Sequence, residues 1–139
     1  MRSQAGFTFT ELLTAVTVMA MMAAVAVPRY AAINSDTRSQ SVRSLAANVQ
    51  SSATLSHKVW QATGQPVRLK LDGQTIDMRF GYPTESSIED LVVMSGEFQF
   101  TDGYWKHRES ESGQGCAVLY IPPPNPNTDA SVITYTDGC

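Results

Sequence analysis

The chain has 139 residues, of which 17% are charged and 42% are apolar, and its formal net charge is −3. This length suits one domain with one modest hydrophobic core. The acidic balance and the scattered two cysteines and two histidines argue against a general nucleic-acid-binding surface and a zinc site, so we predict no nucleic-acid partner, metal or cofactor.

The N-terminal segment consists of a short polar leader, residues 1–6, and an apolar stretch from Phe7 to Val27 whose only ionisable residue is Glu11. As a helix, this stretch would be about 31 Å long, enough to cross the hydrocarbon core of a membrane. A carboxylate inside it costs roughly 2.5–3.5 kcal/mol at the membrane centre. A removable signal peptide or a passive anchor has no use for that cost. Glu11 therefore favours a third interpretation, a leader cut before the apolar stretch.

The segment GFTFTELL, residues 6–13, resembles the cleavage and methylation motif of type IV pilins. The resemblance implies that prepilin peptidase cuts after Gly6 and that Phe7, the new N-terminal residue, is N-methylated to N-methylphenylalanine. Glu11 then stands at the fifth place of the mature chain, where the family carries its key acidic residue. Pro28 matches the helix-bending proline of the family.

Glu11 needs a counter-charge if it is buried in lipid or between helices. The amine of Phe7 on a neighbouring subunit can supply it, and cleavage after Gly6 creates that amine. One axial offset between subunits satisfies both charges, so we expect the pair to fix the register more than to add stability. The alternative is that Glu11 only marks a helix start, where the helix dipole favours a negative charge.

The helical pattern continues beyond Pro28 as one apolar stripe. Its members recur at spacings of three, four or seven: Val42, Leu45, Ala46, Val49, Ala53, Val59 and Trp60. Gly64 and Pro66 end the pattern. We predict a helix from about Phe7 to about Ala62, bent near Pro28, apolar in its first half and amphipathic in its second.

The apolar period changes to two after the helix. Residues 67–71 and 76–80 alternate on either side of Asp72-Gly73, which predicts a β-hairpin. Residues 83–94 are expected to form a short helix or loop, with Thr84 or Ser86 as a cap.

Further strands are predicted in the C-terminal part of the chain, with a turn at Asp102-Gly103. They cover residues 98–100, 104–105, 117–121 and 132–135. The predicted fold is α+β: the long helix packs on a small antiparallel sheet of about four strands, as the type IV pilin resemblance also implies.

Cys116 and Cys139 are expected to form a disulfide, because the chain would leave the cytoplasm. The bond would close a C-terminal loop and contribute roughly 3 kcal/mol in the chain-entropy model. The resemblance supports it, since type IV pilins commonly close a C-terminal loop in this way. Two free cysteines or a bond between subunits are the alternatives.

We predict three regions: a leader (1–6), a hydrophobic transmembrane and polymerisation helix (7–28), and the second half of the helix with a globular head (29–139), including the disulfide loop 116–139.

The resemblance implies a structural subunit of a type IV pilus, or fimbrium, with a role in surface adhesion or motility. It implies a precursor in the bacterial inner membrane, embedded in lipid, and then an extracellular filament that is a helical homopolymer of this chain. Its other partners would be the prepilin peptidase/N-methyltransferase and the pilus assembly platform. No catalytic motif is present, so no enzyme is predicted.

A finer similarity connects the chain with pilins of the mannose-sensitive haemagglutinin type. It rests on the Ser- and Ala-rich segment Ser39 to Ser56, the segment Gly81-Tyr82-Pro83, and the C-terminal Gly138-Cys139. Two alternatives stay open: a minor pilin or pseudopilin of a type II secretion or competence system, and a membrane-anchored binding domain that does not polymerise.

Overall fold

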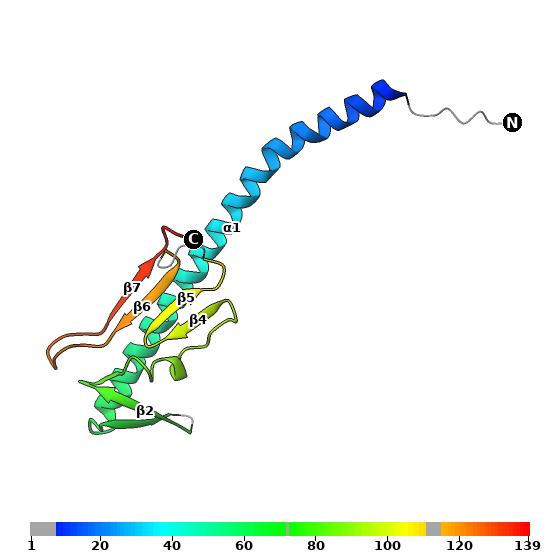
Figure 1. Cartoon of the computed structure of the whole chain (residues 1–139). Helices are drawn as coiled ribbons and strands as arrows, with labels where there is room; N and C mark the ends of the chain where they lie inside the picture. Colours follow the sequence, from blue (N-terminus) through cyan, green and yellow to red (C-terminus); the bar gives the residue numbers. More distant parts are fainter. Residues whose placement is uncertain (1–7, 72, 111–114) are drawn as a thin grey trace. The chain divides into compact units, whose positions relative to one another are not determined.

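The computed structural model describes residues 8–71, 73–110 and 115–139 (Figure 1). Within these residues the chain forms one long α-helix, one short 3-10 helix and seven strands in two antiparallel sheets. It divides into two compact units, Met1–Asp36 and Thr37–Cys139. The α+β class predicted from the sequence is confirmed.

Helix α1 spans Phe9–Ala62, and local backbone geometry explains why it ends there. At the C-terminal end, the backbone N–H of Gln65 donates to the carbonyl of Trp60 at 3.0 Å, and Gly64 takes a positive φ of 85°. This is the Schellman arrangement, in which glycine adopts the left-handed conformation and a bond between residues five apart closes the last turn. The predicted end of the helix is thus confirmed. The helix runs through Pro28 without a break, and the bend expected there remains a prediction.

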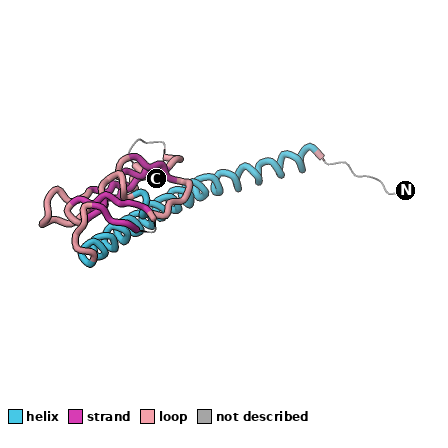
Figure 2. The backbone as a smooth tube through the Cα atoms, turned by 90° about the horizontal axis from the view of Figure 1, so that it is seen from below, coloured by secondary structure: helices cyan, strands magenta, loops and turns pink. Residues whose placement is uncertain are grey.

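The second half of α1 supplies one wall of the core of the 37–139 unit. Its buried stripe consists of Val42, Leu45, Ala46, Val49 and Ala53, as predicted, and of Ser56, which the predicted stripe did not include. These residues pack against strand residues that include Trp105, Val118 and Tyr120. Figure 2 shows the strands and loops gathered on one side of this half of the helix. Val59 and Trp60 continue the stripe but contact a second, smaller cluster.

The three-stranded sheet contains the predicted hairpin. Its strands are β1 (Arg68–Leu71), β2 (Gln74–Arg79) and β3 (Tyr82–Pro83). Leu69 pairs with Ile76, and both side chains are buried with Met78 over the end of α1.

The second strand of this hairpin ends before Phe80, which the alternating pattern had included. Phe80 and Gly81 have φ values of 51° and 87° and connect β2 to β3 in a two-residue turn, with Arg79 paired to Tyr82. Positive φ at both central residues is what a type I′ turn requires. The Phe80 side chain is therefore turned away from the strand pattern and is 43% exposed.

The segment after β3 holds the 3-10 helix η1, Glu89–Leu91. Ile88 stands at its N-cap position without a side-chain hydrogen bond, so the expected cap by Thr84 or Ser86 is wrong. The carbonyl of Thr84 instead accepts the backbone N–H groups of Ser87 and Ile88, which makes a turn before η1. Ile88 and Val92 are buried, and Leu91 is half-buried.

The four-stranded sheet consists of β4 (Phe98–Thr101), β5 (Tyr104–His107), β6 (Ala117–Ile121) and β7 (Ser131–Tyr135). The strands lie in sequential order and every neighbouring pair is antiparallel (Figure 1). Asp102 and Gly103, with φ values of 51° and 80°, form the predicted turn between β4 and β5. The four predicted strands are confirmed, but the hairpin at residues 68–79 belongs to a separate sheet.

Candidate assembly helix and C-terminal loop

The first part of α1 is an apolar helix with no partner within the described chain. The segment Phe9–Val27 has a mean hydropathy of 1.9 and is long and apolar enough to cross a membrane. Its large side chains are exposed on every side, from Val18 at 50% to Phe9 at 77%. A helix that is apolar all round must be covered by lipid or by other helices. This segment therefore confirms the predicted apolar helix.

Glu11 forms a reciprocal cap with Thr8 at the start of this helix. The backbone N–H and the hydroxyl of Thr8 donate to Oε2 of Glu11 at 2.9 and 2.8 Å. In return the backbone N–H of Glu11 donates to the Thr8 hydroxyl at 3.3 Å. The sequence Thr-x-x-Glu is the capping box, which satisfies backbone donors that the first turn leaves free. In the single chain the Glu11 carboxylate thus has a local partner.

The other hydroxyl groups of the apolar segment are also satisfied within the helix. The Thr14 hydroxyl donates to the carbonyl of Glu11 at 2.9 Å, and the Thr17 hydroxyl donates to the carbonyl of Thr14 at 2.8 Å. Such bonds to a preceding turn remove the cost of placing a polar group where no water can reach it. The hydroxyl groups of Thr14 and Thr17 are therefore compatible with a lipid environment.

The remaining predicted processing and assembly residues are only partly placed. Gly6 and Phe7 lie outside the described residues, so the scissile bond and the new amino terminus stay predictions. Pro28 lies inside α1. The proposed partner of Glu11 belongs to another copy of the chain.

Cys116 and Cys139 form the predicted disulfide, with their Cα atoms 4.7 Å apart. Cys116 is fully buried and belongs to the main core, against which Cys139 packs. The backbone N–H of Gly138 donates to the carbonyl of Gly115 at 2.6 Å beside the bond. Since Ala117 pairs with Tyr135 at this end, the disulfide closes the open end of the β6–β7 hairpin.

The loop between β6 and β7 is anchored at its base and exposed at its tip. Pro122 and Pro123 are buried, whereas residues 124–129 are exposed. The backbone N–H of Asn127 donates to the Asn125 side-chain oxygen at 3.1 Å, an arrangement typical of turns. The Tyr82 hydroxyl donates to Oδ1 of Asp129 at 3.0 Å and connects the loop to the core. This contact joins residues 47 apart in sequence, and no local pattern predicts it.

Two buried tyrosines make stability depend on alkaline pH. Burial, followed by the hydrogen bond to Asp129 and the charge of Asp129, raises the pKa of Tyr82. Burial also raises the pKa of Tyr120, whose hydroxyl donates to the carbonyl of Pro83 at 2.9 Å. A phenol with a raised folded-state pKa ionises more readily in the unfolded chain. The contribution of such a phenol to the free energy of unfolding is therefore complete below about pH 10 and is lost as pH rises through its folded-state pKa.

We expect the melting temperature of the full-length chain to fall between about pH 10 and pH 12, the range that begins at the ordinary pKa of a tyrosine. Tyr120→Phe should make this fall less steep, because one of the two raised phenol groups is gone. Thermal unfolding followed by circular dichroism across this range measures the effect. Tyr135→Phe, at an exposed position, is the matched control and should leave the slope unchanged. Equal slopes for the Tyr120 variant and the wild type would contradict the expectation.

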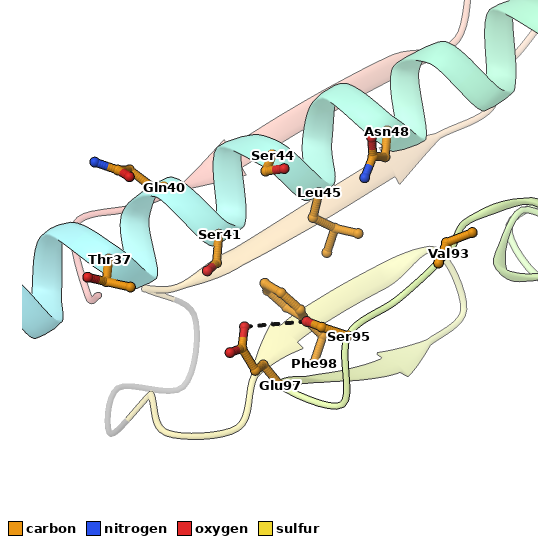
Figure 3. Close-up of a pocket in the computed structure, with 10 residues that line it drawn as sticks. All are labelled: Thr37, Gln40, Ser41, Ser44, Leu45, Asn48, Val93, Ser95, Glu97 and Phe98. Carbon is orange, nitrogen blue, oxygen red and sulfur yellow. Dashed lines mark hydrogen bonds between the residues drawn. The ribbon is translucent and has the colours of Figure 1, made fainter.

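A polar groove lies along the second half of α1 (Figure 3). Its volume is about 390 Å3, and Leu45 and Phe98 are part of its lining. Most of its other lining side chains carry hydroxyl, amide or carboxylate groups: Thr37, Gln40, Ser41, Ser44, Asn48, Ser95 and Glu97. The Ser95 hydroxyl donates to the Glu97 carboxylate at 3.3 Å, the bond drawn in Figure 3. These groups can donate or accept hydrogen bonds.

The histidines and their neighbours have structural hydrogen bonds. The Ser56 hydroxyl donates to the carbonyl of Ser52 at 2.6 Å rather than to the adjacent His57. His107 is buried, and its Nδ1 accepts the backbone N–H of Glu109 at 3.3 Å. Among the described residues, no three His, Cys, Asp or Glu side chains gather in the manner of a metal site.

The comparison with known families agrees with the N-terminal motif. Residues 1–27 match the family described as the prokaryotic N-terminal methylation motif, a family of structural proteins. No curated protein and no solved structure shows significant similarity to the chain. The motif, the apolar helix that follows it and the Cys116–Cys139 disulfide together support a type IV pilin-like or pseudopilin-like protein.

Proposed function

We propose that this chain is a structural subunit of a type IV pilus that polymerises through its N-terminal helix. The observation that carries the proposal is a helix, exposed and apolar on every side, with one carboxylate five places after the cleavage site that the motif implies. Such a helix stays in the membrane as a precursor, because lipid covers its side chains. In a filament, the helices of neighbouring copies replace the lipid.

Glu11 selects the register of assembly in this proposal. Prepilin peptidase cuts after Gly6 and exposes the amine of Phe7, which is then N-methylated. The carboxylate of Glu11 exchanges its bonds to Thr8 for the charged amine of a neighbouring copy. Because a buried charge without a partner is costly, only the offset that joins the two charges is stable.

The 37–139 unit faces the surroundings in the assembled pilus and carries the adhesive or motility role. The exposed tip of the β6–β7 loop, residues 124–129, supports this assignment, since a stiff loop tied by a disulfide presents the same polar groups on every copy. The precursor resides in the bacterial inner membrane and reaches the assembly platform there. The finer similarity to mannose-sensitive haemagglutinin pilins remains a prediction.

A minor pilin or a pseudopilin is the second candidate, because the methylation motif is compatible with it equally well. Abundance separates the two roles. A major pilin dominates filaments sheared from the cell surface, whereas a minor pilin or pseudopilin is a trace component of them. A membrane-anchored domain that never polymerises would be absent from the sheared fraction.

Intact mass spectrometry of the mature chain tests the processing on which the proposal depends. We expect the loss of residues 1–6 and the gain of one methyl group, located on Phe7 by fragmentation. Peptidase-deficient cells are the control and should retain the full-length chain. A mature chain that begins near Val27 would identify a signal peptide, and an uncut chain would identify a plain anchor, so either result contradicts the proposal.

A further inference from the structure

Strand β7 forms a free edge of the four-stranded sheet. The order of that sheet gives β7 only one neighbour, β6 (Figure 1). In an antiparallel pair, alternate residues point their N–H and C=O groups away from the neighbouring strand. Among the described residues, no backbone hydrogen bond from another segment reaches the outer side of β7. This row of donors and acceptors is therefore open to an added strand.

The β7 edge also lacks the features that usually keep edge strands apart. Such strands are often very short, or they carry a charge, a proline or a bulge. The five residues of β7, SVITY, include no charge and no proline, and they pair with β6 without interruption. Ile133 and Tyr135 are each 38% exposed. Since β-branched and aromatic residues favour strand pairing, β7 is suited to bind another strand.

The surroundings of β7 are acidic. Residues 115–139 contain two acidic residues, Asp129 and Asp137, and no Lys, Arg or His. The Asp129 carboxylate accepts the Tyr82 hydroxyl at 3.0 Å. Asp137 is exposed and forms no ion pair within the described part of the chain. A strand that pairs with β7 should therefore carry a positive charge that can meet Asp137.

Strand β1 has this complementary chemistry. It is an edge strand of the three-stranded sheet and carries two exposed basic residues, Arg68 and Lys70. Arg68 is paired with Asp77 of its own sheet at 2.8 Å. Lys70 forms no ion pair with any described residue of its own chain, so its ammonium group is available to Asp137 of another copy.

Like charges oppose the pairing of either edge with itself. An antiparallel β7–β7 pair centred on Ile133 would place Asp129 of one copy opposite Asp137 of the other. A β1–β1 pair would gather the Arg68 and Lys70 side chains of both copies. Like charges on paired strands are destabilising, whereas a mixed pair joins opposite charges. We propose that the β7 edge of one copy pairs with the β1 edge of the next copy.

The proposed contact joins two different surfaces, so it can repeat from copy to copy along a filament, unlike a twofold contact. It rests on the proposed polymerisation and adds a contact within the 37–139 unit to the one between N-terminal helices. Strands of four and five residues form less than a standard protein interface, so a single contact is weak. In a filament the N-terminal helices hold the copies together, which raises the effective concentration of the two edges.

Photochemical cross-linking between copies tests the pairing directly. Ile133→p-benzoylphenylalanine places a photoreactive ring on β7. The full-length chain with this substitution is mixed in detergent with the isotope-labelled full-length chain, so a labelled peptide on the cross-link must come from another copy. We expect labelled peptides that contain Arg68–Leu71. Because this measurement needs no filaments, its outcome is separate from the tests of processing and abundance.

Charge reversal on each side of the contact tests the proposed ion pair. Lys70→Glu in the labelled copy, or Asp137→Lys in the photoreactive copy, should lower capture about fivefold, because an opposite-charge pair becomes a like-charge pair. Mixing the two variants restores opposite charges and should restore capture, which misfolded chains could not do. Lys58→Glu, which reverses an exposed charge on α1 and on neither strand, is the matched control and should leave capture unchanged.

Several results would overturn the pairing of β7 with β1. Capture of a labelled β7 peptide would identify a twofold pair, and capture of any other segment would identify a different contact. Absence of labelled peptides, unchanged capture by Lys70→Glu, or a loss that the mixed variants do not recover would also contradict it. In each case the processing of the chain and its polymerisation through the N-terminal helix would be unaffected.

Discussion

Glu11→Ala is expected to abolish incorporation of the chain into filaments while the 37–139 unit still folds. The substitution removes the carboxylate that would meet the amine of Phe7 on a neighbouring copy. That amine would then be buried without a partner, which costs about 3–5 kcal/mol for an uncompensated buried charge. A free-energy cost of this size, repeated at every subunit, prevents growth of the filament. Immunoblots of sheared filaments and of whole cells measure incorporation and total subunit.

The capping box of Thr8 and Glu11 offers a competing explanation, and Glu11→Gln distinguishes the two. Glutamine can replace glutamate in a capping box because its amide oxygen accepts the same backbone N–H. If Glu11 only caps the helix, the Gln variant assembles normally and the Ala variant does not. If the charge is needed, both variants fail. We expect that neither variant assembles into filaments, and normal filaments from either variant would contradict the pairing mechanism.

Stability of the head is the necessary control for both variants. Since Glu11 lies in the Met1–Asp36 unit, the melting temperature of the 37–139 unit should not change. A variant that loses filaments and also melts earlier would report misfolding and not assembly. The Phe7 modification should persist in both variants if cleavage depends on the leader and Gly6.

Local patterns in the sequence were sufficient for the elements whose stability is local. The stripe from Val42 to Ala53 follows the helical period, because these side chains must share one face to be buried. Gly64 indicated the helix end through its left-handed conformation. Asp102-Gly103 indicated a turn for the same reason.

Contacts between distant segments were not predictable in the same way. The alternating pattern assigned Phe80 to a strand, because periodicity does not register a turn made by an unfavourable residue. The hydrogen bond from Tyr82 to Asp129 and the stacking of His57 on Tyr82 depend on how separate elements pack. The division of the strands into two sheets has the same origin.

The N-terminal site shows a different limit of prediction from sequence. A motif of eight residues predicted its chemistry, because cleavage and methylation read a short linear sequence. The capping box at Thr8 and Glu11 can also be recognised in the sequence as Thr-x-x-Glu. The partner proposed for Glu11 lies on another copy, and a single chain cannot contain that contact.

Loss of the Cys116–Cys139 bond is expected to lower the stability of the 37–139 unit by about 3 kcal/mol, because the bond closes a loop of 23 residues in the unfolded chain. For a unit of this size the melting temperature should fall by roughly 10–20 °C. Reduction of the full-length chain with dithiothreitol, followed by thermal unfolding, measures the change. Cys139→Ser is the cleaner variant, since Cys116 is fully buried and a serine there would add an unpaired hydroxyl.

The double variant Cys116→Ala/Cys139→Ser removes the bond without burying a hydroxyl group at position 116. In the oxidised wild type the two cysteines act as one interaction, so the double variant should lose far less than the sum of the two single variants. The hairpin ladder from Ala117–Tyr135 to Ile121–Ser131 should survive, because its backbone pairing does not need the bond. The exposed tip at residues 124–129 would still be held by this ladder, by the buried Pro122 and Pro123, and by the hydrogen bond from Tyr82 to Asp129. Proteolysis should therefore cut the reduced chain first after Tyr135, at the end of the hairpin that the bond closes, and equal cleavage of reduced and oxidised chains there would show that the disulfide does not hold this end.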